Sequence, residues 1–310
     1  MSGEKQACLT VCLTMRKVLQ PLFFAILSAV LAACSNADGI GLHDTQDLGR
    51  LVRLTGEVSA GDVTVILQAG EELTATGPVV APEGKNLIIR GIPGAPAHIV
   101  LGEGGFVASG SIVIENAVID AATIGTPLIA LSAQPSAEAL NGTDYYDIPT
   151  VTLRNVTVRG LRHELLSDSG EKYCVQRLTV DNSHIGLAAD GTARNGDGNM
   201  QNAGNTPLPA LFNLSSGGAK ELLLTATTVD GNGAQMTDVV AYHPAARLDR
   251  YGFDTATDRQ SIVVEGCLFT AFSVAGKWIN AKSMTANSFT NITMSGNSWV
   301  QCKRPAIARH

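Results

Sequence analysis

The stretch VTLRNVTVRG, residues 151–160, decides the fold. Apolar Val151 and Leu153 alternate with polar residues, Asn155 interrupts the alternation, and Val158 follows it. Alternation with a period of two is typical of a strand with one buried face. Asn tolerates left-handed backbone, so the chain can turn sharply at Asn155 and then continue. The stretch therefore predicts a strand that ends in a sharp corner.

This pattern recurs along the chain, with Asn, Gly or Ala at the corner. The other copies, by their four defining positions, are Ile112, Ile114, Asn116 and Ile119; Leu178, Val180, Asn182 and Ile185; Leu222, Leu224, Ala226 and Val229; Ile262, Val264, Gly266 and Phe269; and Ile292, Met294, Gly296 and Trp299. Shorter apolar runs lie between the copies, at 128–131, 165–166, 211–214, 239–242 and 278–279. One unit of this size cannot bury its own apolar face, but stacked copies can. The repetition therefore predicts a solenoid with at least two strands in each coil.

Other repeat architectures fit the spacing less well. The copies lie at uneven distances, whereas a leucine-rich repeat keeps a stricter spacing and a propeller blade needs four strands. The sequence therefore predicts an all-β fold, a right-handed parallel β-helix over residues 43–302. An antiparallel β-sandwich is the alternative, because short strands at close spacing also suit it. The low charged content of 16% and the 32 Gly residues agree with a long apolar core and many turns.

The segment before the first repeat, residues 44–57, predicts a helix. Leu48, Leu51 and Val52 have helical spacing, and Asp44 or Thr45 is suited to cap the N-terminus. Such a helix would cover the end of the solenoid, which otherwise exposes unpaired strand edges. At the other end, residues 303–310 predict a short basic tail.

The N-terminus has the features of an export signal, which we assign to residues 1–33. Arg16 and Lys17 precede an apolar run, residues 18–32, that is too short to span a membrane with ease. The run ends in small residues before Cys34, which resembles the bacterial lipoprotein signal. The resemblance implies cleavage before Cys34 and lipid attachment to its thiol. An ordinary signal peptide followed by a chance cysteine is the alternative.

Lipidation would define the start of the mature chain. Residues 34–42 would form a lipidated tether, and acyl chains on Cys34 would bind the membrane, since each buried CH₂ contributes about 0.8 kcal/mol. Residues 1–14 fit no part of the signal, so we expect translation to start at Met15. Ser35, directly after Cys34, resembles the residue that directs known lipoproteins to the outer membrane. We therefore expect a lipid-anchored protein of the cell envelope, in the outer membrane or at the cell surface.

Charge limits the partners. Removal of the signal takes away three cations and one anion, which changes the net charge from −6 to −8. An acidic surface does not favour nucleic acid or an anionic membrane face. It also disfavours a polyanionic substrate such as pectate, unless calcium or a local basic patch compensates.

Three cysteines, Cys174, Cys267 and Cys302, remain in the repeat region. They allow at most one disulfide, and their disulfide state is open; none sits at metal-ligand spacing. We interpret them as small core residues.

The repeat region resembles the pectate-lyase-like superfamily of right-handed parallel β-helices. The resemblance rests on the predicted helix and on the stretches VTVILQAGEEL (63–73), NLIIRGIPG (86–94), VTLRNVTVRG and LTVDNSHIG (178–186). With the lipoprotein signal, the chain is similar to surface lipoproteins of the Bacteroidetes type that are associated with glycan utilisation. The resemblance implies a fold but not a reaction, because one fold supports many functions.

Two inserts, residues 132–149 and 244–260, both follow a short apolar run and should leave the solenoid at the same corner. Aromatic faces beside polar groups are suited to hold sugar rings, and charged side chains bond to hydroxyls or carboxylates. The candidate glycan-binding residues are Tyr145, Tyr146, Tyr242, His243, Arg247, Asp249, Arg250 and Tyr251. The alternative is that these rings only fix the loops to the solenoid.

A third insert, residues 188–207, contains oxygen ligands at spaced positions that resemble the start of a calcium loop. The candidates are Asp190, Asn195, Asp197 and Asn199. Met200 occupies the sixth position of that loop and no Glu occupies the twelfth, so a solvated Gly/Asn-rich loop is favoured. Calcium is the one cofactor with any support.

Weak catalytic candidates lie on the outward positions of the repeat. They are Arg154, Asp120, Asp181 and Asp230. Elimination from a uronic acid needs a base and a cation, and glycoside hydrolysis needs two carboxylates about 5–10 Å apart. Asp120 and Asp230 occupy the same repeat position on different coils. His163 and His184 have no partner signature, and we expect them to be surface or loop residues.

One outward column of the repeat consists of Arg90, Glu115, Arg154, Asp181, Thr225 and Glu265. The charges alternate in sign, which predicts cross-strand ion pairs worth about 0–1 kcal/mol each.

The sequence thus favours a cell-envelope lipoprotein whose β-helix domain binds glycans or mediates adhesion in polysaccharide utilisation. A polysaccharide lyase or glycoside hydrolase is the alternative. The expected partners are a glycan and, through Cys34, the membrane, with no nucleic acid. The oligomeric state is open.

Overall fold

The structure is a computed structural model. It describes residues 46–131, 146–169, 173–188, 208–214, 218–232, 235–242, 260–271, 273–281, 290–302 and 307–309. These belong to one compact unit, Gln46–His310. The expected signal peptide and tether lie outside the described residues. Among the described residues, no helix has the length and apolar character needed to cross a membrane.

The unit begins with helix α2, Leu48–Val58, which confirms a helix before the first repeat. The expected cap at Asp44 or Thr45 is wrong, because the N-cap is Asp47, whose side chain accepts a 2.7 Å hydrogen bond from the Arg50 N–H. Such a bond satisfies one of the N–H groups that a helix start leaves without a partner. Leu48 and Val52 of α2 are fully buried in the core.

The other elements of the described residues are strands, and most are short. Their bounds are β1 Val63–Ile66, β2 Glu72–Ala75, β3 Val79–Val80, β4 Leu87–Arg90, β5 Ala97–Leu101, β6 Phe106–Val107, β7 Ile112–Asp120, β8 Ile129–Ala130, β9 Tyr146–Leu161, β10 Leu166–Ser167, β11 Tyr173–Asp181, β12 His184–Leu187, β13 Leu208–Leu214, β14 Gly218–Thr225, β15 Thr228–Asp230, β16 Gln235–Tyr242, β17 Gln260–Glu265, β18 Leu268–Thr270, β19 Ser273–Ala281, β20 Thr290–Ser295, β21 Ser298–Val300 and β22 Ile307–Arg309.

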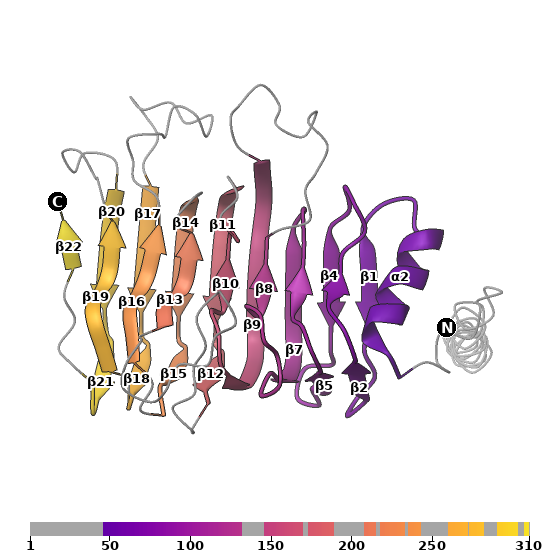
Figure 1. Cartoon of the computed structure of the whole chain (residues 1–310), viewed down its shortest axis with the longest axis horizontal. Helices are drawn as coiled ribbons and strands as arrows, with labels where there is room; N and C mark the ends of the chain where they lie inside the picture. The colour runs from indigo at the N-terminus through magenta and orange to yellow at the C-terminus, as the bar shows by residue number, and fades with distance from the viewer. Residues whose placement is uncertain are drawn as a thin grey trace, which may run out of the picture. The chain divides into compact units, whose positions relative to one another are not determined.

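The strands form a solenoid-like fold of parallel sheets. Figure 1 shows them side by side, in chain order from α2 to β22. One sheet has 14 strands and the other has eight, and each pairing between named strands of the described residues is parallel. The larger sheet bends at a corner, and β7 and β9 run through that corner, so each coil has three faces. We call the face that contains β1, β4, β11, β14, β17 and β20, with the first halves of β7 and β9, the first face.

The strand register confirms the repeat. The first apolar positions of the six copies are successive Cα partners, Ile112, Val151, Leu178, Leu222, Ile262 and Ile292, and Leu87 of the preceding strand β4 pairs with Ile112. The short apolar runs pair with one another in the eight-stranded sheet: Ile129, Leu166, Phe212, Val240 and Ile279. The expectation of at least two strands in each coil is met by three, and the parallel pairing rules out the antiparallel sandwich.

The corner residues adopt the left-handed backbone that the sequence predicts. Asn116, Asn155 and Asn182 have φ angles of 55°, 53° and 45°, and Ala226 and the two Gly residues of the later copies share this region. The Asn155 amide donates to Asn116 Oδ1 at 3.0 Å, and the Asn182 amide donates to Asn155 Oδ1 at 2.7 Å. The corners are therefore joined across coils by a ladder of side-chain amides.

Asn155→Val is expected to lower the free energy of unfolding by about 2–3 kcal/mol. A β-branched residue at φ 53° carries a left-handed penalty of about 1–2 kcal/mol, and two amide hydrogen bonds are lost. Asn155→Gly keeps the backbone freedom and loses only the ladder bonds, so its effect should be clearly smaller. Denaturant unfolding of both variants tests this; equal losses would mean that the backbone conformation is not the cause.

The C-terminal residues differ from the expected tail. Ile307–Arg309 forms β22, which pairs with β19 and extends the eight-stranded sheet. The described part of the last copy thus contributes a strand to all three faces.

Candidate functional site

The outer surface of the first face has three parallel columns of side chains, because the outward positions of adjacent coils are in register. The first column, nearest the N-terminal ends of the strands, consists of Thr150, Arg177, Glu221 and Ser261. The middle column is largely apolar, with Ile88, Val113, Thr152, Thr179, Leu223 and Val263. The third column is the predicted charged one. This arrangement places polar groups on both sides of an apolar strip.

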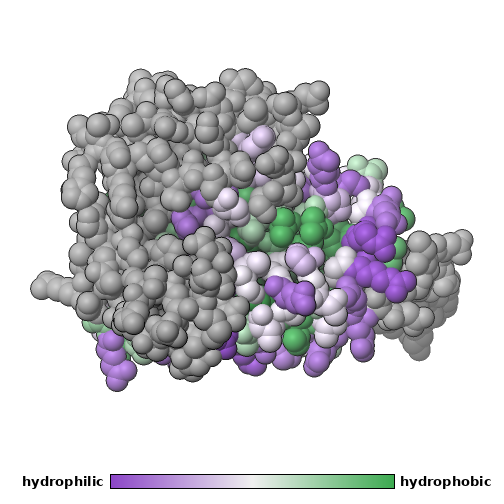
Figure 2. Space-filling model, viewed as in Figure 1, coloured by the Kyte–Doolittle hydropathy of each residue, from purple (hydrophilic) through white to green (hydrophobic). Residues whose placement is uncertain are grey.

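The middle column was not expected from the sequence. Ile88, Val113, Leu223 and Val263 point outward and are only half-buried. In Figure 2, hydrophobic surface (green) gathers over the region of β4 and β7, with hydrophilic surface (purple) toward α2. An apolar strip between polar columns suits a ligand with alternating hydroxyl and C–H surfaces.

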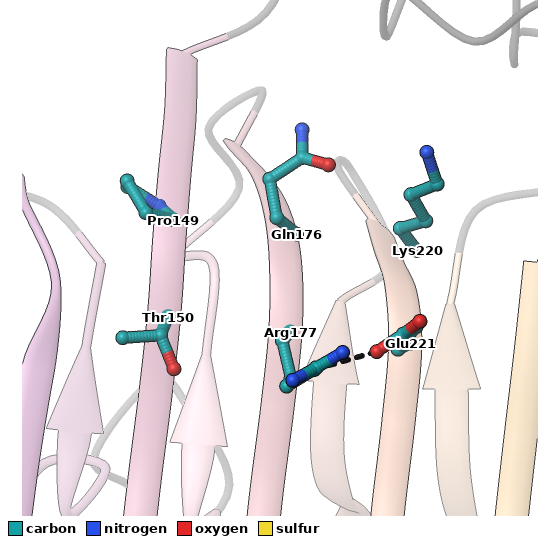
Figure 3. Close-up of a pocket in the computed structure, with 6 residues that line it drawn as sticks. All are labelled: Pro149, Thr150, Gln176, Arg177, Lys220 and Glu221. Carbon is teal, nitrogen blue, oxygen red and sulfur yellow. Dashed lines mark hydrogen bonds and ion pairs between the residues drawn. The ribbon is translucent and has the colours of Figure 1, made fainter.

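A polar hollow of about 400 Å³ lies on this face, across β9, β11 and β14. Its lining residues are Pro149, Thr150, Gln176, Arg177, Lys220 and Glu221. Figure 3 shows that each strand contributes two of them, and that Gln176 and Lys220 extend toward the same end of the strands. Residues about 70 positions apart in sequence, on β9 and β14, are therefore brought to one hollow by the stacking of three successive coils.

Hydrogen bonds hold the groups that line the hollow. Arg177 Nε donates to Glu221 Oε2 at 2.6 Å, and the Gln176 amide donates to Asp147 Oδ1 at 2.8 Å. The hydrogen bond that Arg177 donates to Glu221, followed by the negative charge of Glu221, raises the pKa of Arg177. Two cations, Arg177 and Lys220, and the Glu221 carboxylate line the hollow, and the Asp147 carboxylate accepts from the lining Gln176 amide, so charges of both signs gather there.

The predicted charged column forms ion pairs. The Glu115 carboxylate accepts from Arg90 Nε and from a terminal nitrogen of Arg154, each at 2.9 Å. Arg154 Nε also lies 3.7 Å from a carboxylate oxygen of Asp181. Thr225 then donates to Asp181 at 2.6 Å. The structure brings the catalytic candidates Arg154 and Asp181 together, but each is engaged by its neighbours in the column.

The other two catalytic candidates are far apart. Asp120 on β7 and Asp230 on β15 occupy equivalent positions beyond the corner, with β9 and β12 between them. Three strand spacings of about 4.8 Å place them about 14 Å apart. Each accepts a hydrogen bond from a nearby backbone N–H, of Ala122 and Asn232 respectively. The structure does not bring these two carboxylates into one site.

Of the candidate glycan-binding residues, Tyr146 has a described side chain. It is half-buried, packs against the core and contacts the ring of the fully buried Tyr173, with centroids 5.3 Å apart. Only the backbone of Tyr242 is described, at the end of β16. The other candidates, Tyr145, His243, Arg247, Asp249, Arg250 and Tyr251, lie outside the described residues.

The two inserts that carry these candidates do leave the same corner. Residues 132–145 connect β8 to β9, and residues 243–259 connect β16 to β17. Both connections run from the eight-stranded sheet to the first face. The hollow begins at this corner, where β9, β11 and β14 start.

The calcium candidates Asp190, Asn195, Asp197 and Asn199 also lie outside the described residues. Within the residues that the structure does describe, no three His, Cys, Asp or Glu side chains gather as a metal site would require.

The cysteines of the repeat region are free thiols, and Cys174 and Cys267 are buried, as expected for small core residues. Cys267 Sγ lies 3.2 Å from the Leu224 carbonyl, at the repeat position that Thr227 fills one coil earlier. Burial, followed by the charge of Asp147, raises the pKa of Cys174 to about 12, and burial also raises the pKa of Cys267.

Cys174 is expected to resist alkylation at pH 8.5, at a rate at least about 100-fold below that of the unfolded chain. The folded state keeps the thiol neutral while the unfolded thiol ionises near pH 8.5, and the thiolate is the reactive form. For the same reason Cys174 costs stability as the pH rises from about 9 toward 12. Peptide mass spectrometry after iodoacetamide measures the rate, and equal labelling with and without urea would contradict the prediction.

A buried pair of ionisable side chains was missed by the sequence reasoning. His163 and Glu164 are 0% and 1% exposed, and His163 Nδ1 lies 3.9 Å from Glu164 Oε2. Asp168, four residues on, is 1% exposed. Of the two places expected for these histidines, surface or loop, His163 lies in a connection between strands but is buried there, and His184 is exposed.

Comparisons with protein-family models, with curated proteins and with solved structures found no match to this chain.

Proposed function

We propose that this chain is a glycan-binding protein of the cell envelope, held to the membrane by lipid on Cys34. In this proposal the solenoid-like unit is a right-handed parallel β-helix of the pectate-lyase-like type. Its support is the parallel, three-faced stacking of repeat units behind a helix that buries Leu48 and Val52. The lipid anchor is supported by the signal-like sequence that ends at Cys34.

The polar hollow of β9, β11 and β14 is the observation that carries the proposal. Its lining offers a guanidinium, an ammonium, an amide, a hydroxyl and a carboxylate in one shallow site. Sugar hydroxyls both donate and accept hydrogen bonds, so a mixed set of donors and acceptors suits them. In the middle column beside the hollow, the Leu223 side chain and the Thr179 methyl group can pack against the C–H faces of sugar rings.

The shape and charge of the site favour a polymer over a compact ligand. The columns continue across several coils, so a polymer that lies across the strands meets a new outward side chain in each column at every step of about 4.8 Å. Arg177 and Lys220 offer two cations that can bond to hydroxyl or carboxylate groups of a glycan on an otherwise acidic chain.

A lyase or hydrolase on the same fold has less support. Arg154 lies within 4 Å of both Glu115 and Asp181, so two carboxylates already engage the guanidinium that would have to act as the base. Asp120 and Asp230, about 14 Å apart by strand spacing, exceed the separation of about 5–10 Å that hydrolysis uses.

A panel of plant, host and microbial polysaccharides tests the proposal. Binding to the purified chain and release of products are measured together, with and without calcium. We expect retention by at least one glycan and no products. Unsaturated or reducing-end products would instead support the enzyme, and no retention by any glycan in the panel would count against the binding function.

A further inference from the structure

The hollow lies where three adjacent strands interrupt their pairing at the same level. Strand β11 pairs with both of its neighbours at Val175 and at Arg177, and within the described strands no paired position lies between them, at Gln176. Neighbouring residues of a regular strand point to opposite faces. On each of β9, β11 and β14, however, two consecutive residues line the hollow (Figure 3). This level therefore adds one outward side chain to each of the three strands.

The hollow ends after these three strands. On the β7 side the same level is occupied by Gly110, which has no side chain. On β17 it is occupied by Gln260, which is 1% exposed and donates to the Ala219 carbonyl at 2.9 Å. The charges that a bound ligand meets first are therefore those of β9, β11 and β14.

Charges of the two signs balance at the hollow. Arg177 and Glu221 form an ion pair of 2.6 Å, and Lys220 is the second cation of the lining. The second carboxylate is that of Asp147, which accepts from the lining Gln176 amide at 2.8 Å. Two cations thus lie with two carboxylates, and the charges of the described residues at the hollow sum to zero.

The surroundings of the hollow are acidic rather than basic. In the third column, the charged residues are two cations and three carboxylates: Arg90, Arg154, Glu115, Asp181 and Glu265. Four segments lead from the eight-stranded sheet to the first face, and their sequences contain four Lys or Arg and six Asp or Glu: residues 132–145, 170–172, 215–217 and 243–259. A polyanion would therefore approach a region of its own sign, and such repulsion acts over about 8 Å at physiological ionic strength.

We propose that the hollow selects uncharged sugars, so that the ligand of this chain is a neutral polysaccharide rather than a polymer of uronic acids or sulfated sugars. The inference rests on glycan binding at the hollow. A sugar hydroxyl both donates and accepts, so it can bond to Glu221 and to Arg177 without separating the pair. A sugar carboxylate only accepts, and it would lie beside Glu221 and Asp147, where like charges oppose binding.

Pairs of polysaccharides that differ in charge test the inference: hydroxyethyl and carboxymethyl cellulose, methyl-esterified and free polygalacturonate, and dextran and dextran sulfate. Any other polysaccharide that the chain retains is compared as its hydroxyethyl and carboxymethyl derivatives. Retention of the purified chain is measured on beads that carry one member of a pair. We expect the neutral member of at least one pair to retain the chain at least about five-fold more strongly than the anionic member.

Salt gives a second measurement. Retention by a neutral glycan should persist at about 1 M NaCl, where the Debye length falls to about 3 Å, because an uncharged ligand is not held by long-range attraction.

Glu221→Gln removes one carboxylate from the hollow and keeps the size of the side chain. It should lower the ratio of neutral to anionic retention at least about three-fold, because Arg177 then has no negative partner in the lining. Glu115→Gln is the matched control. Glu115 also accepts from arginine, at 2.9 Å, but it lies three strands from Glu221, about 14 Å by strand spacing. This variant should keep the ratio of the wild type, and circular dichroism checks that both variants are folded.

The outcomes distinguish a failure of this inference from a failure of glycan binding. Equal or stronger retention by the anionic members, loss of retention at high salt, or the same ratio in Glu221→Gln and Glu115→Gln would overturn the selection of uncharged sugars and leave glycan binding in place. Retention by neither member of any pair would contradict glycan binding, and the inference with it.

Discussion

Gly105→Ala is expected to destabilise the unit by at least about 3 kcal/mol, the upper part of the range for overpacking. A Cβ at this position would lie 2.3 Å from the Leu128 carbonyl oxygen and 2.4 Å from the Pro127 carbonyl oxygen. Both are backbone atoms of the next coil, and the Leu128 oxygen accepts the Phe106 N–H at 2.7 Å. The methyl group therefore cannot fit without separating two coils.

The control for this prediction is Gly77→Ala, where a Cβ would meet no heavy atom within 4 Å. Its stability should stay within about 1 kcal/mol of the wild type. Thermal and denaturant unfolding of the two variants, followed by circular dichroism, compare them. If Gly105→Ala unfolds at the same denaturant concentration as Gly77→Ala, the close stacking of coils around residue 105 is not correct.

Removal of both cations of the hollow, Arg177→Ala with Lys220→Ala, should weaken glycan retention at least ten-fold. Hydrogen bonds to charged groups contribute about 1.5–3 kcal/mol each, and about 1.4 kcal/mol corresponds to a factor of ten. Both side chains line the hollow, and Arg177 is held in place by Glu221 at 2.6 Å. Affinity electrophoresis in a gel that contains the bound polysaccharide measures the effect.

Arg90→Ala is the matched control for the hollow. Arg90 is also an exposed arginine of the first face that pairs with a glutamate of the next strand, at 2.9 Å from Glu115, but it lies three coils from Arg177. It should bind glycan like the wild type. Equal weakening in both variants would indicate a general charge effect rather than a site.

The periodic part of the fold could be predicted from the sequence because each coil must meet the same two structural requirements. Alternating apolar residues such as Val151 and Leu153 must face one core, and Asn155 must supply a left-handed corner. The register, the corners and the short apolar runs followed from these requirements and are confirmed. The third strand of each coil could not be recognised in the sequence, because a segment as short as β15 or β18 shows too little alternation of apolar and polar residues.

Features that depend on contacts between distant residues could not be predicted. Asp47 rather than Asp44 caps α2, and its carboxylate also receives the Thr76 hydroxyl at 3.3 Å, a contact made across the first coil. His163 is buried although it lies in a corner without periodicity. The hollow contains both Thr150 and Glu221, which are distant in sequence and lie near each other only because of the register of β9, β11 and β14.

The most direct test of glycan binding at the hollow is a crystal structure of the chain with an oligosaccharide taken from a polysaccharide that it retains. The account predicts sugar density across β9, β11 and β14, within hydrogen-bonding distance of Arg177 and Lys220. The same structure would show the handedness of the coils. Sugar bound elsewhere, with the hollow of Arg177 and Glu221 filled by water alone, would contradict the account.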